Sequence, residues 1–267
     1  VRQILAFIEK DVLLEIRIKA NVLSRFFNPL IQLFLYILLF GIIFNIQTGY
    51  NLGYWNANNY LLFLLLAFCI QFTKTIMNKY RQLFLIEKYW KTLSAIMIAP
   101  VNRITLLLGG LFSELVMVSI PFITLFVIAL VIYPIPFLNL LLVLLILFLI
   151  FIVFGSIGLL IGAFSISQEE YVYYSEIALR ILFLISCINF PKEIFPKIVQ
   201  GFVGLNPFYY LFDLLRLSWY MGINYEISIS LITPIHIIAV IGLAVLSPLI
   251  ASYLFNKIYK KYGITGY

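Results

Sequence analysis

The sequence is poor in charged side chains and in residue types that bind metals. Only 11% of its 267 residues are charged, whereas about a quarter are charged in a typical soluble domain. It has one histidine, His236, and two cysteines, Cys69 and Cys187, which lie far apart in apolar runs. This excludes a site built on several histidines and favours neither a disulfide nor a zinc site. We interpret the cysteines as core residues and His236 as a hydrogen-bonded helix residue, and we predict no metal site.

A phosphate-binding loop of the form Gly-x-x-x-x-Gly-Lys-Ser/Thr is also absent from the sequence. If the protein uses ATP, another chain must therefore bind it. The sequence also offers no convincing set of nucleophile, base and metal ligands for an intramembrane enzyme. We predict a non-enzymatic chain with no catalytic residues and no cofactor of its own.

Apolar side chains make up 64% of the sequence, which is more than a soluble fold of this size can bury. A bilayer crossing needs about 20 apolar residues. The pattern predicts an all-α membrane protein with six transmembrane helices. We expect these at about residues 29–46, 59–78, 106–133, 139–163, 172–190 and 229–255. Asn28 and Pro29 are typical of a helix start, and the two prolines between Tyr133 and Asn139 indicate a tight helical hairpin.

Basic residues are distributed unevenly between the ends of these predicted helices. Under this layout, 14 of the 18 Lys and Arg residues lie on one side of the membrane and three on the other. Cytoplasmic loops are enriched in Lys and Arg, so both termini are predicted to be cytoplasmic. The net charge of +7 therefore indicates an oriented cell-membrane protein, and we expect no nucleic-acid partner.

Residues 1–26 are predicted to form an amphipathic helix on the inner membrane surface, before a six-span domain over 27–267. An apolar row at Ile4, Ile8, Val12 and Ile16 has helical spacing. Charged residues, including Asp11 and Glu15, are expected on the other side. Packing of this helix against the rest of the protein is the alternative.

The segment 190–226 is apolar but divided by prolines. Its two apolar pieces, 194–205 and 208–220, are too short to cross a bilayer at about 1.5 Å per residue. We predict a re-entrant helical hairpin in the outer leaflet between spans five and six. A plain external loop with surface helices is the alternative.

Apart from Lys74, which is counted with the inner basic residues, three charged residues lie within the predicted spans: Glu114, Glu176 and Arg180. Charges at such depth are costly and usually face protein or a pathway. Glu176 and Arg180 are four residues apart, a spacing that favours an ion pair on one helix face. Glu114 has no local partner, so it is either an anchor near the interface or a pathway residue. The three side chains leave open a second function, an ion-coupled secondary transporter.

Two segments resemble the type-2 ABC exporter permeases. In the inner segment 79–103, the resemblance is carried by Glu87, Lys88, Thr92, Leu93, Pro100, Val101 and Arg103, followed by Leu108 and Gly109. Lys91 and Ser94 depart from the family pattern, which usually has glycine and an acid there. In the outer segment, it is carried by Ser186, Phe190, Pro191, Pro196, Gln200, Leu205, Asn206, Pro207, Tyr210, Asp213 and Arg216. Cys187 stands where the family commonly has glycine.

The resemblance implies the permease subunit of an ATP-driven exporter, with a second permease copy, the lipid bilayer and cytoplasmic ABC ATPase subunits as partners. ATP and Mg would be bound by the ATPases. The implied ATPase-coupling residues are Glu87, Lys88, Trp90, Lys91, Thr92, Leu93, Ser94, Pro100 and Arg103. The implied external gate comprises Pro191, Pro196, Asn206, Pro207, Tyr210, Asp213 and Arg216. Asp213 and Arg216, three residues apart on one helix face, would brace this gate; a plain surface pair is the alternative. The substrate stays open.

Overall fold

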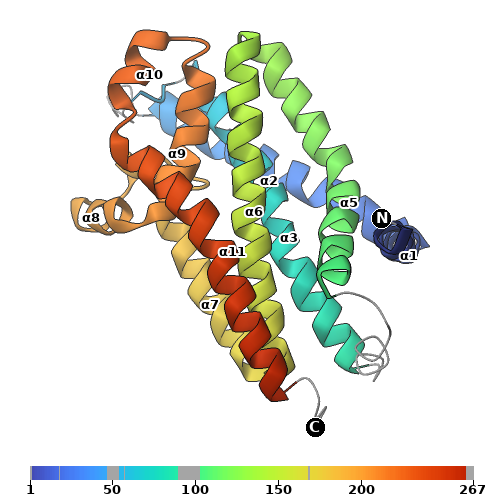
Figure 1. The fold of residues 1–267 in the computed structure, drawn as a ribbon. Helices are drawn as coiled ribbons and strands as arrows, with labels where there is room; N and C mark the ends of the chain where they lie inside the picture. The colour runs from blue at the N-terminus through green and yellow to red at the C-terminus, as the bar shows by residue number, and fades with distance from the viewer. Residues whose placement is uncertain are drawn as a thin grey trace.

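The computed structural model describes residues 2–17, 19–46, 54–56, 58–89, 103–167 and 169–262, and within these ranges it contains helices and no strand (Figure 1). The helices are α1 Arg2–Arg17, α2 Lys19–Ile46, α3 Tyr60–Tyr89, α5 Arg103–Ile132, α6 Phe137–Ser167, α7 Glu169–Ile185, α8 Lys197–Leu205, α9 Pro207–Tyr220, α10 Tyr225–Leu231 and α11 Pro234–Tyr262, with a 3-10 turn at Lys192–Ile194. The predicted all-α class is confirmed for these residues.

Five of the helices are long and apolar enough to cross a membrane. The apolar stretches are Val22–Ile42, Tyr60–Met77, Gly109–Ile132, Phe137–Phe164 and Pro234–Ile258. The helix at the fifth predicted crossing, α7, has 17 residues and includes Glu176 and Arg180. It is shorter than these five helices.

Helix α3 occupies the centre of the bundle. It packs against α5 on one side and α6 on the other, while α6 also packs against α11 and α9. Large apolar side chains from these helices, including Phe68, Ile150, Phe154, Phe212 and Trp219, are buried in one cluster. Apolar side chains on the outward faces of α2, α5 and α11 are exposed, as expected of surfaces that contact lipid.

The long helices from α3 onwards, including α7, alternate in direction along the chain (Figure 1). α5 and α6 form the predicted antiparallel hairpin, joined by residues 133–136. α6 and α11 lie side by side and run in the same direction, so the chain must return between them; α7 runs back along the bundle (Figure 1). The ends of α6 and α11, the start of α7 and the end of α3 therefore lie at one end of the molecule.

The N-terminal region differs from the prediction at two points. The helix predicted over 1–26 ends at Arg17, and α2 then continues through Pro29, which does not start a helix. Proline removes one backbone hydrogen bond, but membrane helices tolerate it because neighbouring groups satisfy the freed carbonyl. α1 packs against α5, with Asp11 and Glu15 turned towards the bundle and Ile16 exposed.

The outer segment forms two short helices, α8 and α9, as the prolines predict. Pro196 precedes α8, and Asn206 caps α9 by accepting a hydrogen bond from the backbone N–H of Phe208 at 3.0 Å. Pro207 occupies the first position of α9, where its missing N–H costs nothing. The last predicted span begins later than expected, because α10 precedes it and Pro234 starts α11.

Candidate functional site

The predicted ATPase-coupling residues are only partly within the described structure. Glu87 and Lys88 belong to the last turn of α3, and Arg103 is the first residue of α5. Trp90, Lys91, Thr92, Leu93, Ser94 and Pro100 lie outside the described residues. The two helices that flank this segment, α3 and α5, pack against each other.

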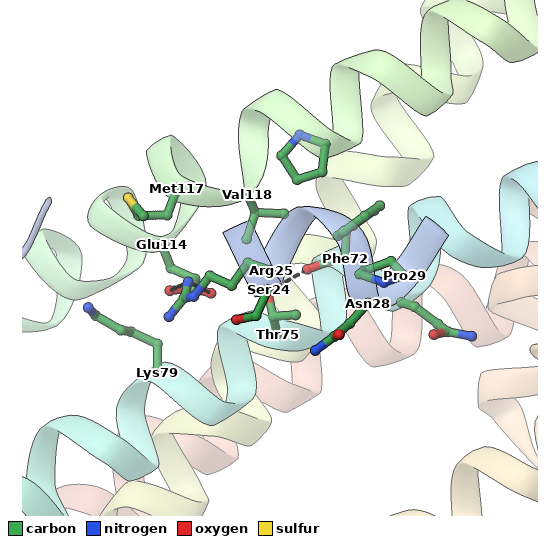
Figure 2. A pocket seen from close by; sticks show the side chains of 12 residues that line it. Ser24, Arg25, Asn28, Pro29, Phe72, Thr75, Lys79, Glu114, Met117 and Val118 are labelled. Carbon is green, nitrogen blue, oxygen red and sulfur yellow. Dashed lines mark hydrogen bonds and ion pairs between the residues drawn. The ribbon is translucent and has the colours of Figure 1, made fainter. Parts of the chain in front are cut away.

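Five charged side chains from four helices form what we call the charge cluster: Asp11, Glu15, Arg25, Lys79 and Glu114. Arg25 Nη1 lies 3.0 Å from both carboxylate oxygens of Glu114, and Arg25 Nη2 lies 2.9 Å from Glu15 Oε2. Lys79 Nζ lies 2.7 Å from Glu15 Oε1 and 3.3 Å from Asp11 Oδ2. Figure 2 shows the Arg25 guanidinium directed at the Glu114 carboxylate.

The charge cluster joins α1, α2, α3 and α5. Burial disfavours the charged form of Lys79, but the carboxylates of Asp11 and Glu15 outweigh burial and raise its pKa above the ordinary value. Lys79 is therefore charged at neutral pH. Glu114, which has no local partner in the sequence, pairs with Arg25, 89 residues away.

A hollow of about 290 Å³ adjoins the charge cluster between α2, α3 and α5 (Figure 2). Beside the charged side chains, it is lined by polar groups of Ser24, Asn28, Gln71 and Thr75. Glu114 is 2% exposed and uses both its oxygens on Arg25. This arrangement favours a structural joint over a proton carrier for Glu114.

A second polar region, the α3–α7 cleft, consists of two adjoining hollows that share Lys74, Arg180 and Phe183. The hollow nearer the end of α3 has a volume of about 270 Å³ and includes Glu176; the other, of about 240 Å³, reaches Asn189 and Phe190 in the outer segment. Lys74 Nζ lies 4.3 Å above the centre of the Phe183 ring. The structure thus brings Glu176 and Arg180 to one cleft, while their direct ion pair stays a prediction.

Lys74 was not singled out by the sequence, because it was counted among the basic residues of the inner rim. The structure places it within the membrane-length apolar stretch of α3, facing the cleft. Lys74 and Arg180 are far apart in the sequence, so the sequence alone does not reveal that they line the same cleft. A single charged residue in a helical stretch of membrane length was the available signal.

Asp213 is the centre of an outer polar network formed with Tyr54, Tyr209, Thr233 and His236. It accepts hydrogen bonds from the Tyr54 hydroxyl at 3.0 Å and from the Tyr209 hydroxyl at 3.5 Å. The backbone N–H of Thr233 donates to Nδ1 of His236 at 3.2 Å, so the proton of a neutral imidazole lies on Nε2, which is 3.2 Å from Asp213 Oδ2. The interpretation of His236 as a hydrogen-bonded helix residue is confirmed.

Arg216 is not half of a plain surface pair with Asp213, because it is buried and contacts other groups. It is 1% exposed; its Nη2 donates to the carbonyl of Ile188 at 2.6 Å, and its guanidinium lies 4.0 Å above the centre of the Phe63 ring. A planar guanidinium suits such stacking. Asp213 and Arg216 still interact electrostatically, but each fixes a different neighbour of α9.

The remaining predicted gate residues hold the outer segment together. Asn206 Nδ2 donates to the carbonyl of Leu182 at 3.2 Å and to the hydroxyl of Ser186 at 2.9 Å, which ties the start of α9 to the end of α7. The Tyr210 hydroxyl donates to the carbonyl of Gly204 at 2.7 Å. Pro191 is buried before the 3-10 turn. The region is a packed cap on the bundle in this conformation.

The chain matches the ABC-2 type transporter family over residues 2–220. This match covers most of the chain, including α1 to α9 and the charge cluster. No curated protein matches the chain. The chain belongs to the ABC-2 type transporter family, and it is a multi-pass membrane protein and the permease of an ABC transporter.

Proposed function

We propose that the chain is the transmembrane permease subunit of an ATP-driven exporter, and that two copies enclose the substrate pathway. The observation that supports this most directly is the α3–α7 cleft. It places Lys74 and Arg180 on a hollow surface at membrane depth. A protein that served only as an anchor would have no need of such a surface.

Arg180 supports the second copy. Its side chain is exposed in the single chain, and an arginine facing lipid near the middle of a crossing costs about 2.5 to 3.5 kcal/mol on insertion scales. A second copy covering α7 would remove the side chain from lipid and close the cleft into a pathway. The outer segment, α8 and α9, would then be the external gate.

Six crossings with cytoplasmic termini are part of the proposal. Five helices have the length of a crossing, and α7 returns between the parallel helices α6 and α11 (Figure 1). With 17 residues, α7 rises about 25 Å, so α7 and the segment that follows it would complete the sixth crossing. The basic rim would then face the cytosol.

Energy would come from separate cytoplasmic ABC ATPase subunits that bind ATP and Mg. They would dock on the inner segment 79–103, including the end of α3 at Glu87 and Lys88. Motion of this segment would reach both α3 and α5, which it connects, and α3 forms one wall of the cleft.

Charge reversal tests the docking. Glu87→Lys and Lys91→Glu, singly and together, are expected to reduce co-purification of the ATPase subunit and ATP-dependent transport in proteoliposomes, because docking of a helix on a groove depends on matching charges. Lys257→Glu, on the exposed end of α11, is the control. Unchanged co-purification and transport in the double reversal would exclude this docking role.

An ion-coupled secondary transporter is not favoured. Such a relay requires Glu114 to communicate with Glu176 and Arg180, yet Glu114 lines the hollow between α2, α3 and α5, while the other two line the α3–α7 cleft. Transport driven by an ion gradient in vesicles that contain no ATPase subunit would revive this function.

A further inference from the structure

We propose that the α3–α7 cleft binds the anionic group, a phosphate or a carboxylate, of an amphiphilic ligand between Lys74 and Arg180. This inference rests on the proposed function, because it gives the chemical class of the substrate that enters the pathway. It goes further in assigning a site and two binding residues.

Charge is the first reason. Among the described residues that line the two hollows, two are basic, Lys74 and Arg180, and one is acidic, Glu176. The cleft is therefore positive overall. Both hollows include both basic residues, so an anion in either one lies near two cations.

The environment of Lys74 is the second reason. Its Nζ lies 4.3 Å from the centre of the Phe183 ring, and the positive charge of Arg180 repels it. Two like charges in a partly desolvated cleft repel each other, which is costly at low dielectric. An anion between them would offset that repulsion, as a guanidinium and an ammonium together bind phosphate or carboxylate oxygens.

The lining of the cleft indicates an amphiphile rather than a small inorganic anion. Leu179, Phe183, Leu184, Ile188 and Phe190 form an apolar wall along α7 and the outer segment. Lys74 is three residues from the inner end of its membrane stretch, about 5 Å along the helix axis. Lys74 therefore lies towards the inner end of its membrane stretch, with the apolar wall extending outwards from it beside an alkyl chain.

Binding of dodecyl phosphate to the purified full chain tests the proposal. Nanodiscs of phosphatidylcholine hold the protein, and radiolabelled dodecyl phosphate is compared with dodecyltrimethylammonium, which has the same tail and the opposite charge. Lys74→Gln and Arg180→Gln should each weaken dodecyl phosphate binding about tenfold or more, since each removes a charge-assisted hydrogen bond. The double variant should bind no more than background.

Two controls separate the site from general effects of charge and folding. Lys197→Gln removes an exposed basic residue of α8 and should leave binding unchanged. The exchange K74R/R180K keeps both cations and should retain most of the binding, which shows that the Gln variants fail for lack of charge and not of fold. Full binding by K74Q/R180Q, loss of binding in Lys197→Gln, or equal binding of the trimethylammonium compound would overturn the proposal.

Nanodiscs that also contain phosphatidylglycerol identify the source of the anionic group. Competition by this lipid assigns the site to an anionic headgroup of the bilayer, whereas undiminished dodecyl phosphate binding assigns it to a separate cargo; both outcomes support an anion site. The measurement uses the chain without an ATPase. A failure here therefore leaves the exporter proposal standing, and a failure of ATPase docking leaves the anion site standing.

Discussion

Asp213 shows how one buried acid is held by a hydroxyl donor from a distant part of the chain and by a second one on its own helix. Tyr54 donates to one of its oxygens at 3.0 Å, and Tyr209 approaches the other at 3.5 Å. Burial raises the pKa of the Tyr54 hydroxyl, and Asp213 raises it further. Tyr54 therefore keeps its proton at any physiological pH, and its hydrogen bond to Asp213 is permanent.

The two tyrosines give a matched pair of substitutions. Tyr54→Phe should reduce the free energy of unfolding by about 1 to 3 kcal/mol, because it removes one of the hydrogen bonds that satisfy the buried carboxyl group of Asp213. Tyr209→Phe should cost less than about 1 kcal/mol, since a contact at 3.5 Å is at the limit of hydrogen bonding. Thermal unfolding of both variants in one detergent measures the difference. Equal losses would show that Asp213 does not distinguish its two donors.

Cys187 has a backbone conformation that favours glycine. Its φ is 55°, just after α7 ends at Ile185, and this left-handed conformation costs an L-residue about 1 to 2 kcal/mol relative to glycine. Its side chain is buried and fills space that glycine would leave empty. The glycine common at this position in the family therefore has a conformational reason, and the cysteine compensates by packing.

Comparing Cys187→Gly with Cys187→Ala separates these two effects. Both variants lose the sulfur atom, but only the alanine keeps a Cβ in the left-handed conformation. Cys187→Gly should therefore unfold at the higher temperature, by about 2 to 4 °C per kcal/mol for a chain of this size. An alanine variant as stable as the glycine variant, or more so, would show that residue 187 relaxes to another backbone conformation.

At the scale of the helices, the close approach of α1 and α5 depends on Gly109. A Cβ built at this residue would lie 2.7 Å from the Cβ of Phe7 on α1. Because a Cβ cannot move without its backbone, any side chain at 109 must push α1 away from α5. This gives a physical reason for the glycine in the inner motif that resembles the family.

Gly109→Ala should loosen α1 and destabilise the charge cluster. We expect faster hydrogen exchange over residues 2–17 and a loss of about 1 to 3 kcal/mol, typical of overpacking. Gly41→Ala is the matched control, since nothing lies within 4 Å of its Cβ position in the middle of α2; it should be neutral or stabilising because alanine favours helix. If exchange over 2–17 is the same in both variants, α1 is not held by this contact.

Local patterns predicted helices well and contacts between helices poorly. The Asn206 and Pro207 start of α9 and the turn after Tyr133 follow from residue chemistry within a few positions, so the sequence alone identifies them. Glu114 has no partner nearby in the sequence, and Asp213 and Arg216 were expected to act as a pair. The actual partners, Arg25 and His236, are 89 and 23 residues away, and helical periodicity gives the face of a residue but not the helix that will pack on it.

The contacts of α1 were missed for the same reason, because the sequence does not show which helices pack together. Its spacing predicts a helix with an apolar row, and α1 is a helix. Asp11 and Glu15 were expected on the side away from that row. In the structure they face the bundle, where Asp11 pairs with Lys79 and Glu15 pairs with Arg25. A buried acid is stable only with such a partner, and the partner comes from helices that the local sequence does not reveal.

At the scale of the whole molecule, the outward face of α7 bears on how two copies would meet in the proposed dimer. Arg180 makes this face unsuitable for lipid, while α11 presents an almost wholly apolar outer face in which Ile238 is 68% exposed. Lipid suits the second face and a protein partner suits the first. The two faces therefore predict one arrangement of the dimer, with α7 near the partner subunit and the outer face of α11 in the bilayer.

Cysteine crosslinking in native membranes tests that arrangement. Leu184→Cys, at a position 59% exposed on α7, should form a disulfide-linked dimer on mild oxidation, because two copies of α7 line the same pathway. Ile238→Cys should stay monomeric under the same conditions, although its side chain is more exposed. The native Cys69 and Cys187 are buried and give the background of the parent protein. Crosslinking through Ile238→Cys and none through Leu184→Cys would place α11 at the interface and leave Arg180 to be covered in some other way.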